Sequence, residues 1–446
     1  MQFRLLLVAS LLTACASVQA QNPNTLSIGV ASRVVTPFLD QPMAGYYYPR
    51  AADGVHDDLM AKALVLGNGQ DRVVLVAIDA VEVPADIVQP ARERIQKKLG
   101  IPADHIMISA THSHTGSQFT PLYKDLLIHW IEDTVVLAVN RSAPAHLSVA
   151  YDQEPTLQRN RRYLMKDGTV QTNPGFLNPN VVRPVGPVDP TVGVLYAEGA
   201  CGAPIMTWVN YGLHLDTVGG TLISADFAAP LAKFLGRVKT PEMLTIFTIG
   251  PAGDINHWDV SKPGPQRGFD VAERIGNVLG ASVVRAYTHM EPVAPAKISA
   301  ISEALELPAA TVTEQEVEDA RKIDAKPPEQ GVDFTIERVK AERDIRVYER
   351  HGKPYLAEIQ VFAVGQVAFV AIPGELFNEL GSRIRKESPF AYTFLVTLAN
   401  DDIGYIPIRA GFAQGGYEPS SSGLQPGAGE AIADKAIELL KRISAQ

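Results

Sequence analysis

The sequence predicts an α/β fold with a large mixed β-sheet core, in one sheet or two, flanked by helices. Three observations predict it: apolar runs of strand length, amphipathic segments between them, and polar residues directly after several runs. Strands mixed with helices in this way are typical of α/β domains. Open α/β sheets bind ligands beyond the carboxyl ends of their strands, so we expect the active site there.

Ten apolar runs are predicted to be buried strands: 26–32, 61–67, 72–79, 106–110, 192–198, 204–210, 243–250, 358–364, 366–372 and 393–399. Helical spacing of apolar residues predicts helices over 87–99, 121–140 and 429–444. Three breaker-rich stretches, 167–191, 261–268 and 409–430, are predicted to be long functional or mobile loops. Segment 324–333 resembles a linker, but strands continue beyond it. We therefore expect one domain over 21–446.

The N-terminus has the features of an export signal. A single arginine precedes the apolar stretch Leu5–Leu12, which is too short to span a bilayer. Val18-Gln19-Ala20 resembles a signal-peptidase site, whereas Leu12-Thr13-Ala14-Cys15 resembles a lipobox that would leave a lipidated Cys15 as a membrane anchor. Residues 1–20 are thus predicted to be a signal peptide, with the lipobox as the alternative. Either reading predicts export from a bacterial cytoplasm, to the periplasm, the outer membrane or the medium.

The composition excludes some classes of function. With 46% hydrophobic residues among 446, the chain can bury a large core. Its formal charge of -9 and lack of a basic cluster argue against nucleic-acid binding, which needs grouped Lys and Arg. Only Cys15 and Cys201 are cysteines. Because the first is expected to be lost or lipidated, we expect no internal disulfide, and Cys201 reads as a small turn residue.

Residues suited to metal chemistry follow five of the predicted strands. They are His112 and His114, His214, Asp254 to His257, Glu375, and Asn400 to Tyr405. In an extended chain, residues two apart point the same way, so His112 and His114 could share one metal, or one could face substrate. Zn²⁺ favours histidine nitrogen and carboxylate oxygen. Each residue alone also has a structural interpretation; Glu375, for example, suits the first turn of a helix.

Several segments together resemble the neutral/alkaline non-lysosomal ceramidase family. They are "SATHSHTG", "VNYGLHLDT", "AIPGELFNELGSRIR", "NDDIGYIPIRAGFAQGGYE", and the earlier "IGVASRVVTP" and "HDDLMAKALVLGNGQDRVVLVAIDAVEV". The resemblance runs in the same order from about Ile28 to Ile443. It implies a short bacterial member with the catalytic domain only, without the C-terminal immunoglobulin-like domain of the larger members.

The resemblance also implies roles for individual residues. One Zn²⁺ per chain would be bound by His112, His214, Glu375 and Tyr405. His114 would lie beside the metal-bound water, Tyr417 would face the scissile carbonyl, and Arg161 would be a substrate-side arginine. This sequence departs from the family at Asn256, where the family has a serine. An amide can hydrogen-bond to substrate or water but cannot be a serine-like nucleophile.

These roles predict a zinc-dependent hydrolase that cleaves an N-acyl amide bond through a metal-activated water. Zinc lowers the pKa of bound water to about 7, and His114 could relay the proton because the pKa of a free histidine lies near working pH. Tyr417 would donate to the developing oxyanion. Tyr405 would act as a phenolate ligand or a second donor, and Arg161 would bind a substrate hydroxyl or carboxylate.

Other polar residues are predicted to be less central. Asp254 and His257 are candidate substrate contacts, with loop hydrogen bonding as the alternative. Asp216 and Asp226 are candidates to orient a ligand histidine, and Asp226 alternatively caps a helix. Five histidines without partners in the sequence are expected to be structural: His105, His129, His146, His289 and His351.

Three substrate hypotheses follow. The first is an N-acyl lipid such as ceramide. The second keeps the zinc chemistry but acts on an ester or on the N-acyl group of a sugar or small metabolite. The third is a surface-anchored binding protein without catalysis. A lipid site would show an apolar trough leading to the metal, whereas a sugar site would show polar and aromatic walls.

Overall fold

The computed structural model describes residues 26–69, 71–294, 297–327 and 335–446. The predicted signal peptide and the lipidation site at Cys15 lie outside these residues. Within them, no helix has the length and apolar character needed to cross a membrane.

Two β-sheets form the framework, so the predicted fold class is confirmed, with two sheets rather than one. The larger has nine strands, in the order β14 (Leu244–Ile249), β12 (Pro204–Tyr211), β11 (Thr191–Gly199), β6 (Ala143–Gln153), β1 (Ser27–Val34), β3 (Met60–Gly67), β4 (Arg72–Ile78) and β5 (Ile106–Ala110), with β16 (Glu291–Pro292) paired to β6. The smaller has the order β17 (Ile298–Leu307), β18 (Tyr355–Val364), β19 (Val367–Ile372) and β21 (Tyr392–Thr397).

Parallel pairing places the chemistry-bearing loops at one end of the sheets. The pairs β4–β5, β12–β14 and β19–β21 are parallel, whereas the other neighbours among the long strands are antiparallel. β1 and β6 pair only where Ser27 meets Pro144 and Ile28 meets Ala143, so the two halves of the larger sheet diverge beyond that point. The loops after the parallel strands therefore leave from the same region.

All ten predicted strands are present, and two long strands were missed. β6 and β17 lack a continuous apolar run; β17 reads "ISAISEALEL" and alternates polar with apolar residues. Such alternation suits a half-exposed strand at the edge of a sheet. β17 is the edge strand of the smaller sheet, which explains why its burial alternates.

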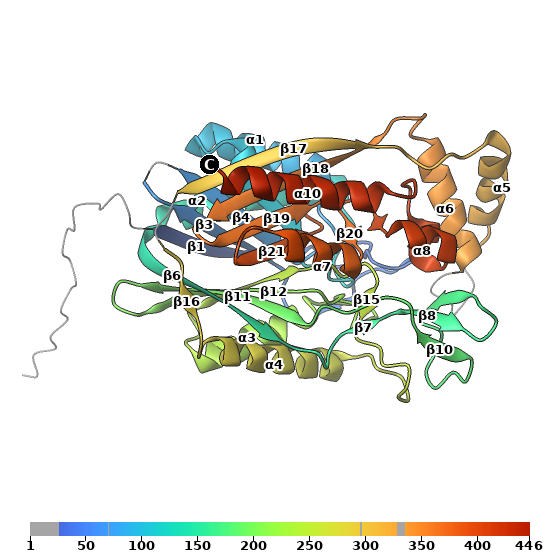
Figure 1. Ribbon diagram of the computed structural model, residues 1–446, viewed down its shortest axis with the longest axis horizontal. Helices are drawn as coiled ribbons and strands as arrows, with labels where there is room; N and C mark the ends of the chain where they lie inside the picture. Colours follow the sequence, from blue (N-terminus) through green and yellow to red (C-terminus); the bar gives the residue numbers. More distant parts are fainter. Residues whose placement is uncertain (1–25, 70, 295–296, 328–334) are drawn as a thin grey trace, which may run out of the picture.

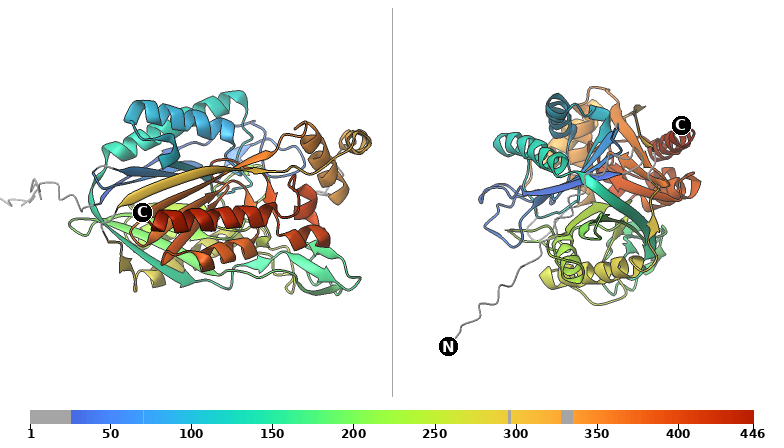
Figure 2. Two further views of the ribbon diagram at one scale, coloured as in Figure 1. Left: turned by 45° about the horizontal axis from the view of Figure 1, so that its top comes forward. Right: turned by 90° about the vertical axis from the view of Figure 1, so that its left-hand side faces the viewer.

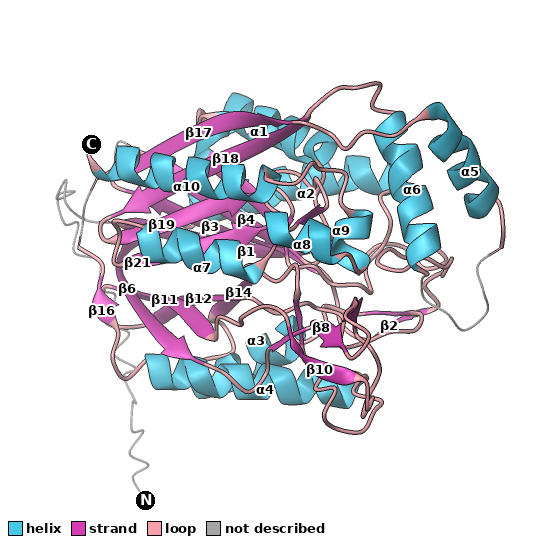
Figure 3. Cartoon of the chain, turned by 45° about the vertical axis from the view of Figure 1, so that its right-hand side comes forward, coloured by secondary structure: helices cyan, strands magenta, loops and turns pink. Residues whose placement is uncertain are grey.

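Helices enclose the two sheets (Figure 1, Figure 2). The larger sheet is covered by α1 (Ala85–Leu99), α2 (Pro121–Asn140), α3 (Ala228–Val238) and α4 (Phe269–Ala286). The smaller sheet is covered by α7 (Asn378–Glu387) and α10 (Ala428–Ser444). The pair α5 (Glu314–Asp324) and α6 (Ile336–Tyr348) stands at one end of the molecule, beside the short helices α8 (Arg409–Gln414) and α9 (Tyr417–Ser421) (Figure 3).

The helix boundaries follow from local chemistry. Thr120 caps α2 by accepting a hydrogen bond from the Tyr123 amide, and Pro121 occupies the first turn, where its missing N–H costs nothing. α1 ends at Gly100, whose φ of 71° suits glycine in a left-handed cap.

Short elements build the loops. They are the 3₁₀ turn Ala103–His105 and the strands β2 (Gly54–Val55), β7 (Arg159–Asn160), β8 (Arg162–Met165), β9 (Val170–Thr172), β10 (Val181–Pro184), β13 (Leu222–Ile223), β15 (Ile255–Asn256), β20 (Glu375–Leu376) and β22 (Tyr405–Ile406). Two pairs matter for the site: β15 pairs with β7, and β20 pairs with β22. They tie loops distant in sequence to one another.

The layer between the two sheets carries the largest aromatic side chains. Trp208 of the larger sheet meets Phe369 of the smaller sheet edge-on at 5.9 Å between ring centroids, and Phe369 stacks on Phe394 at 5.3 Å. Both phenylalanines are fully buried. This layer holds the two sheets together and therefore fixes the relative positions of the loops at their ends.

Phe369→Ala is expected to lower the free energy of unfolding by about 3–5 kcal/mol, because it removes a buried ring and leaves a cavity between the sheets. Urea unfolding followed by circular dichroism measures the change. Phe38→Ala, at a ring that is 61% exposed, is the matched control and should change stability little. Equal midpoints for the two variants would contradict this account of the core.

Candidate active site

Three histidines from two loops form one buried group. Their ring nitrogens lie within 4.8 Å of one another. His112 Nε2 lies 3.1 Å from His214 Nε2 and 3.3 Å from His114 Nε2. Each Nδ1 faces a backbone carbonyl. His112 Nδ1 lies 2.7 Å from the Val81 carbonyl, His114 Nδ1 lies 2.8 Å from that of Gly45, and His214 Nδ1 lies 2.9 Å from that of Ala252. Because a carbonyl needs a donor, each Nδ1 carries the proton and each Nε2 presents a lone pair.

His112 and His114 converge for a different reason than the predicted one. The chain is not extended at His112, which has a φ of 76°. Its amide and that of Ser113 both donate to the Ala80 carbonyl, at 2.8 and 3.0 Å. This left-handed turn aims both rings into the same space. It is an unusual conformation for a residue with a side chain, and such strain is typically found at functional sites.

Glu375 joins the histidines from the smaller sheet. Its Oε2 lies 3.1 Å from His214 Nε2 and 3.4 Å from His112 Nε2. Despite these distances, no donor among the described residues is aligned for a hydrogen bond to that buried oxygen. The backbone fits tightly here, since a Cβ on Gly253 would lie 2.3 Å from the Glu375 carbonyl oxygen. Three imidazole lone pairs and one carboxylate oxygen thus share a small volume.

Burial and neighbouring charge control the protonation of this group. Burial lowers the pKa of His214 to about 3, with Arg161 acting in the same direction, and burial lowers the pKa of His114 to about 4. Burial also favours a lower pKa for His112, but the Glu375 carboxylate outweighs this effect and raises the pKa of His112. The same pairing with His112 holds the pKa of Glu375 well below its usual value, against the effect of burial. Glu375 is therefore ionised at neutral pH, and His114 and His214 are neutral.

Tyr405 enters the site opposite Glu375, because the two residues are register partners in the β20–β22 pair. Its hydroxyl accepts a hydrogen bond from Arg161 Nη2 at 3.0 Å. Arg161 Nη1 lies 3.2 Å from His214 Nε2, and Nη2 also donates to the Gly253 carbonyl at 2.9 Å. Arg161 therefore connects Tyr405 with the histidine group. It is buried within the wall of the site rather than extended from it.

Glu418 was not anticipated from the sequence, yet it anchors this arginine. Its side chain is fully buried and receives Arg161 Nε at 2.7 Å on one oxygen and Thr172 Oγ1 at 2.8 Å on the other. The Arg162 guanidinium lies 3.4 Å away. A buried carboxylate needs such a partner, and a buried guanidinium needs one equally. The only signal in the sequence is its position directly after Tyr417 in "GGYE".

Tyr417 stands at the first position of α9, beside Tyr405. The two rings lie 5.4 Å apart in an edge-on arrangement. The Tyr417 hydroxyl lies 3.1 Å from that of Tyr47, another residue that sequence reasoning did not single out. Burial raises the pKa of Tyr417 well above its usual value, so the phenol keeps its proton and can donate.

The segment around Tyr47 forms the other side of the site. Arg50 donates to the carbonyls of Ala44, His114 and Gly220, and its guanidinium lies 4.1 Å from the centre of the Tyr46 ring. Tyr46 in turn lies edge-on to the His114 ring at 5.8 Å. The sequence "GYYYPR" carries these residues, but its tyrosines have no spacing that predicts a site.

The remaining predicted residues occupy the walls. The Asn256 side chain donates to Asn173 Oδ1 at 2.8 Å and accepts from the Trp258 amide at 3.1 Å. Asp254 accepts from the Asn378 amide at 2.8 Å and from Asn160 Nδ2 at 2.7 Å. His257 Nε2 donates to the Gln266 carbonyl at 2.7 Å. These contacts match the loop-bonding alternative for Asp254 and His257.

Neither Asp216 nor Asp226 orients His214, because the His214 Nδ1 faces the Ala252 carbonyl instead. Asp216 instead accepts hydrogen bonds from Tyr46 and Arg267. Asp226 accepts from the amides of Thr217, Val218 and Phe227. α3 begins after Phe227 without a side-chain cap, so the expectation that Asp226 caps this helix is also wrong.

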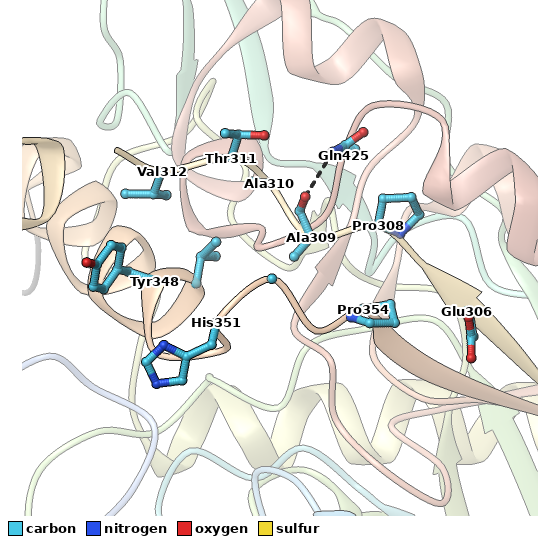
Figure 4. A pocket seen from close by; sticks show the side chains of 12 residues that line it. Glu306, Pro308, Ala309, Ala310, Thr311, Val312, Tyr348, His351, Pro354 and Gln425 are labelled. Carbon is cyan, nitrogen blue, oxygen red and sulfur yellow. Dashed lines mark hydrogen bonds between the residues drawn. The ribbon is translucent and has the colours of Figure 1, made fainter. Parts of the chain in front are cut away.

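The histidines expected to be structural lie apart from the group. His105, His129 and His289 each contact a backbone carbonyl near the surface, at 2.9, 2.8 and 3.1 Å. His146 is an exposed residue of β6. His351 lines a separate surface pocket of about 700 Å³ between α6 and the segment after β17 (Figure 4). Cys201 is exposed in the turn between β11 and β12.

The fold has relatives among solved structures. No protein-family model and no curated protein matches the sequence. A solved neutral ceramidase from Pseudomonas aeruginosa is similar, with a TM-score of 0.75 at 19% identity over 94% of this chain and 75% of that one. The chain has a neutral ceramidase-like fold. A ceramidase complexed with C2 gives a TM-score of 0.74 at 18% identity over 94% of this chain and 76% of that one.

The neutral ceramidase-like fold confirms the architecture that the sequence motifs implied. In this fold the chain brings together His112, His114, His214, Glu375, Arg161, Tyr405 and Tyr417. The structure adds Glu418, Tyr46, Tyr47 and Arg50 to the predicted set. The individual roles assigned to these residues stay predictions.

Glu418→Gln is expected to destabilise the protein by about 3–5 kcal/mol, because glutamine keeps the shape but leaves the buried Arg161 charge uncompensated. Urea unfolding of the purified variant measures the effect. Glu438→Gln removes a carboxylate from an exposed ion pair with Lys435 and should change stability far less. A Glu418→Gln variant as stable as the wild type would show that the guanidinium does not depend on this partner.

Asp226 is expected to make stability depend on pH. Burial raises its pKa to about 6, whereas an aspartate in an unfolded chain titrates near 3.9. The folded state therefore binds the extra proton between these values. The contribution of protonated Asp226 to the free energy of unfolding is therefore complete below about pH 4 and is lost as the pH rises through about 6.

Urea midpoints of wild type and Asp226→Asn, measured from about pH 4 to 7, test this sign. The wild-type advantage should shrink as the pH rises. Asp53→Asn, at an exposed carboxyl, should run parallel to the wild type. Parallel curves for Asp226→Asn would contradict the assignment.

Proposed function

We propose that the chain is a zinc-dependent hydrolase of an N-acyl amide bond. The observation that carries the proposal is the cluster of three imidazole Nε2 atoms, of which those of His112 and His214 lie within 3.4 Å of one Glu375 carboxylate oxygen. With all their protons removed, these donor atoms would repel one another unless a cation lay between them. The neutral ceramidase-like fold favours amide hydrolysis over other metal-dependent reactions.

The donor set fits zinc. Neutral imidazole nitrogen and carboxylate oxygen are preferred zinc ligands, and each imidazole is oriented by a carbonyl behind it, as in known zinc sites. His112, His214 and Glu375 would hold the ion, with Tyr405 beside them. When bound there, zinc would supply a Lewis acid for the attacking water and the substrate carbonyl.

The chain's own residues would then handle protons and charge. His114 is neutral at pH 7, so its Nε2 can accept a proton from the attacking water and return it to the leaving nitrogen. The Tyr417 hydroxyl would donate to the carbonyl oxygen as negative charge develops. Arg161 would keep Tyr405 and His214 in place through its bridging hydrogen bonds. Asn256 would contribute hydrogen bonding only, since an amide is no nucleophile.

The location of the enzyme is part of the proposal. Residues 1–20 would direct export, and a lipidated Cys15 would anchor the protein to a membrane if the lipobox is used. Both readings place the site outside the bacterial cytoplasm.

Purified wild-type protein incubated with Zn²⁺ and dialysed is expected to retain about one zinc per chain, measured by atomic absorption, and its amide hydrolysis should be sensitive to a chelator. His214→Ala should lose most of the metal and the activity. Saturating zinc should also raise the stability of the wild type, by about 2.7 kcal/mol at 100 times the dissociation constant.

His129→Ala is the matched control, because that exposed histidine of α2 lies apart from the histidine group and bonds to the Asp125 carbonyl. It should retain metal like the wild type. Absence of stoichiometric zinc in the wild type, or full metal content in His214→Ala, would refute the proposed centre.

A further inference from the structure

Several of the side chains near the histidine group that reach solvent are tyrosines. Tyr46, Tyr47, Tyr48 and Tyr417 are each partly exposed, and we refer to these four as the tyrosine rim. Tyr46 and Tyr48 lie 5.5 Å apart between ring centroids. His114 is partly exposed beside them. Rings that carry hydroxyl groups therefore lie beside the histidine group.

Charged groups extend the same surface. Asp216 and Arg267 form an ion pair at 2.5 Å whose side chains are 30% and 33% exposed. Both side chains contact Tyr46. The Arg267 guanidinium lies 5.0 Å from the centre of the Tyr46 ring, which the Arg50 guanidinium also contacts. A carboxylate and a guanidinium held side by side can bond to neighbouring hydroxyls of a polar substrate.

The aliphatic side chains next to the site in sequence point into the core instead. Leu213, Leu215 and Val218 flank His214 and are at most 1% exposed, within the core under the helices of the larger sheet. Ile403 and Ile406 flank Tyr405 and are 7% and 0% exposed, within the core under α10. Among the described residues, none of these is offered to a bound acyl chain.

A small apolar surface remains beside the Arg50 contacts. Val55 and Leu222 are 45% and 37% exposed and lie on the paired strands β2 and β13, where a Cβ on Gly54 would be 2.7 Å from Leu222 Cδ2. Two side chains can cover an acyl group of a few carbons. They cannot cover the long chains of a ceramide.

The tyrosine rim is also fixed rather than adaptable. Arg50 bonds to three carbonyls and packs on the Tyr46 ring, and a Cβ on Gly45 would lie 2.8 Å from the His114 Cα. Opening this segment into a trough would break these contacts together. The polar walls therefore belong to the resting shape of the site.

We propose that the site hydrolyses short-chain N-acyl amino sugars, with the sugar ring bound against the tyrosine rim; this deepens the proposed amide hydrolysis and rests on it. Tyrosine faces pack on the C–H faces of sugars while their hydroxyls and the Asp216–Arg267 pair take the sugar hydroxyls. Water oxygen forms a bond to the acyl carbon, the C–N bond breaks, and a water proton passes to the leaving nitrogen. The products are a short carboxylate and a free amino sugar.

Four substrates separate acyl length from the leaving amine: acetyl and dodecanoyl amides of glucosamine and of sphingosine, assayed with the zinc-loaded protein. An apolar groove gains about fourfold in kcat/KM for each methylene it buries. We expect N-acetylglucosamine to give the highest kcat/KM, at least tenfold above any substrate with a long chain. A tenfold advantage for either dodecanoyl amide or for a sphingosine amide overturns this inference and leaves the hydrolase intact. No chelator-sensitive turnover of any substrate removes both.

Tyr48→Ala tests the rim itself. Loss of this ring should raise KM for N-acetylglucosamine several-fold while kcat changes little, because Tyr48 contacts Tyr46 and Arg50 rather than the histidines. Phe38→Ala, at an exposed aromatic on the preceding segment, is the matched control and should leave both constants unchanged. An unchanged KM in Tyr48→Ala would exclude binding against this ring.

Discussion

The buried contact between Arg161 and Glu418 holds the candidate site together. Arg161 follows β7, Glu418 lies in α9, and the guanidinium also reaches Tyr405 and His214. One ion pair thus fixes loops from both sheets. A guanidinium beside a histidine that would bind a cation is electrostatically unfavourable by itself. The Glu418 carboxylate neutralises that charge, so positive charge is not doubled at the metal position.

Backbone contacts orient the three histidines of the site. Each is oriented by a backbone carbonyl from a different loop, those of Gly45, Val81 and Ala252. A backbone carbonyl does not titrate and is present whatever the side chain of its residue, so it keeps the proton of the facing histidine on Nδ1. Because burial lowers the pKa values of His114 and His214, the Nε2 atoms of these two rings stay unprotonated at neutral pH. The carbonyl contacts also explain why no aspartate is needed behind the three histidines.

The neutral ceramidase-like fold does not by itself set the substrate, which depends on the surface around the site. The fold is shared with solved proteins described as ceramidases. Here the partly exposed side chains at the histidine group include tyrosines, an aspartate and an arginine, while the leucines next to His214 in sequence are buried. The chemistry of a site and its substrate are separable properties, because the first needs a few fixed donors and the second depends on the walls around them.

The sequence by itself determined the ten apolar strands, the helices α1, α2 and α10, and the residues that gather at the strand ends, but not the helices α4, α5 and α6. Apolar runs and helical spacing are local, and the motif residues could be recognised where they stand. It missed β6 and β17, whose alternating patterns lack a continuous apolar run. Only the tertiary structure decided the partners of each residue: the turn at His112, the carbonyl behind His214, and the pairing of Glu418 with Arg161. These contacts join residues far apart in the chain, and no local pattern records which distant group will satisfy a buried charge.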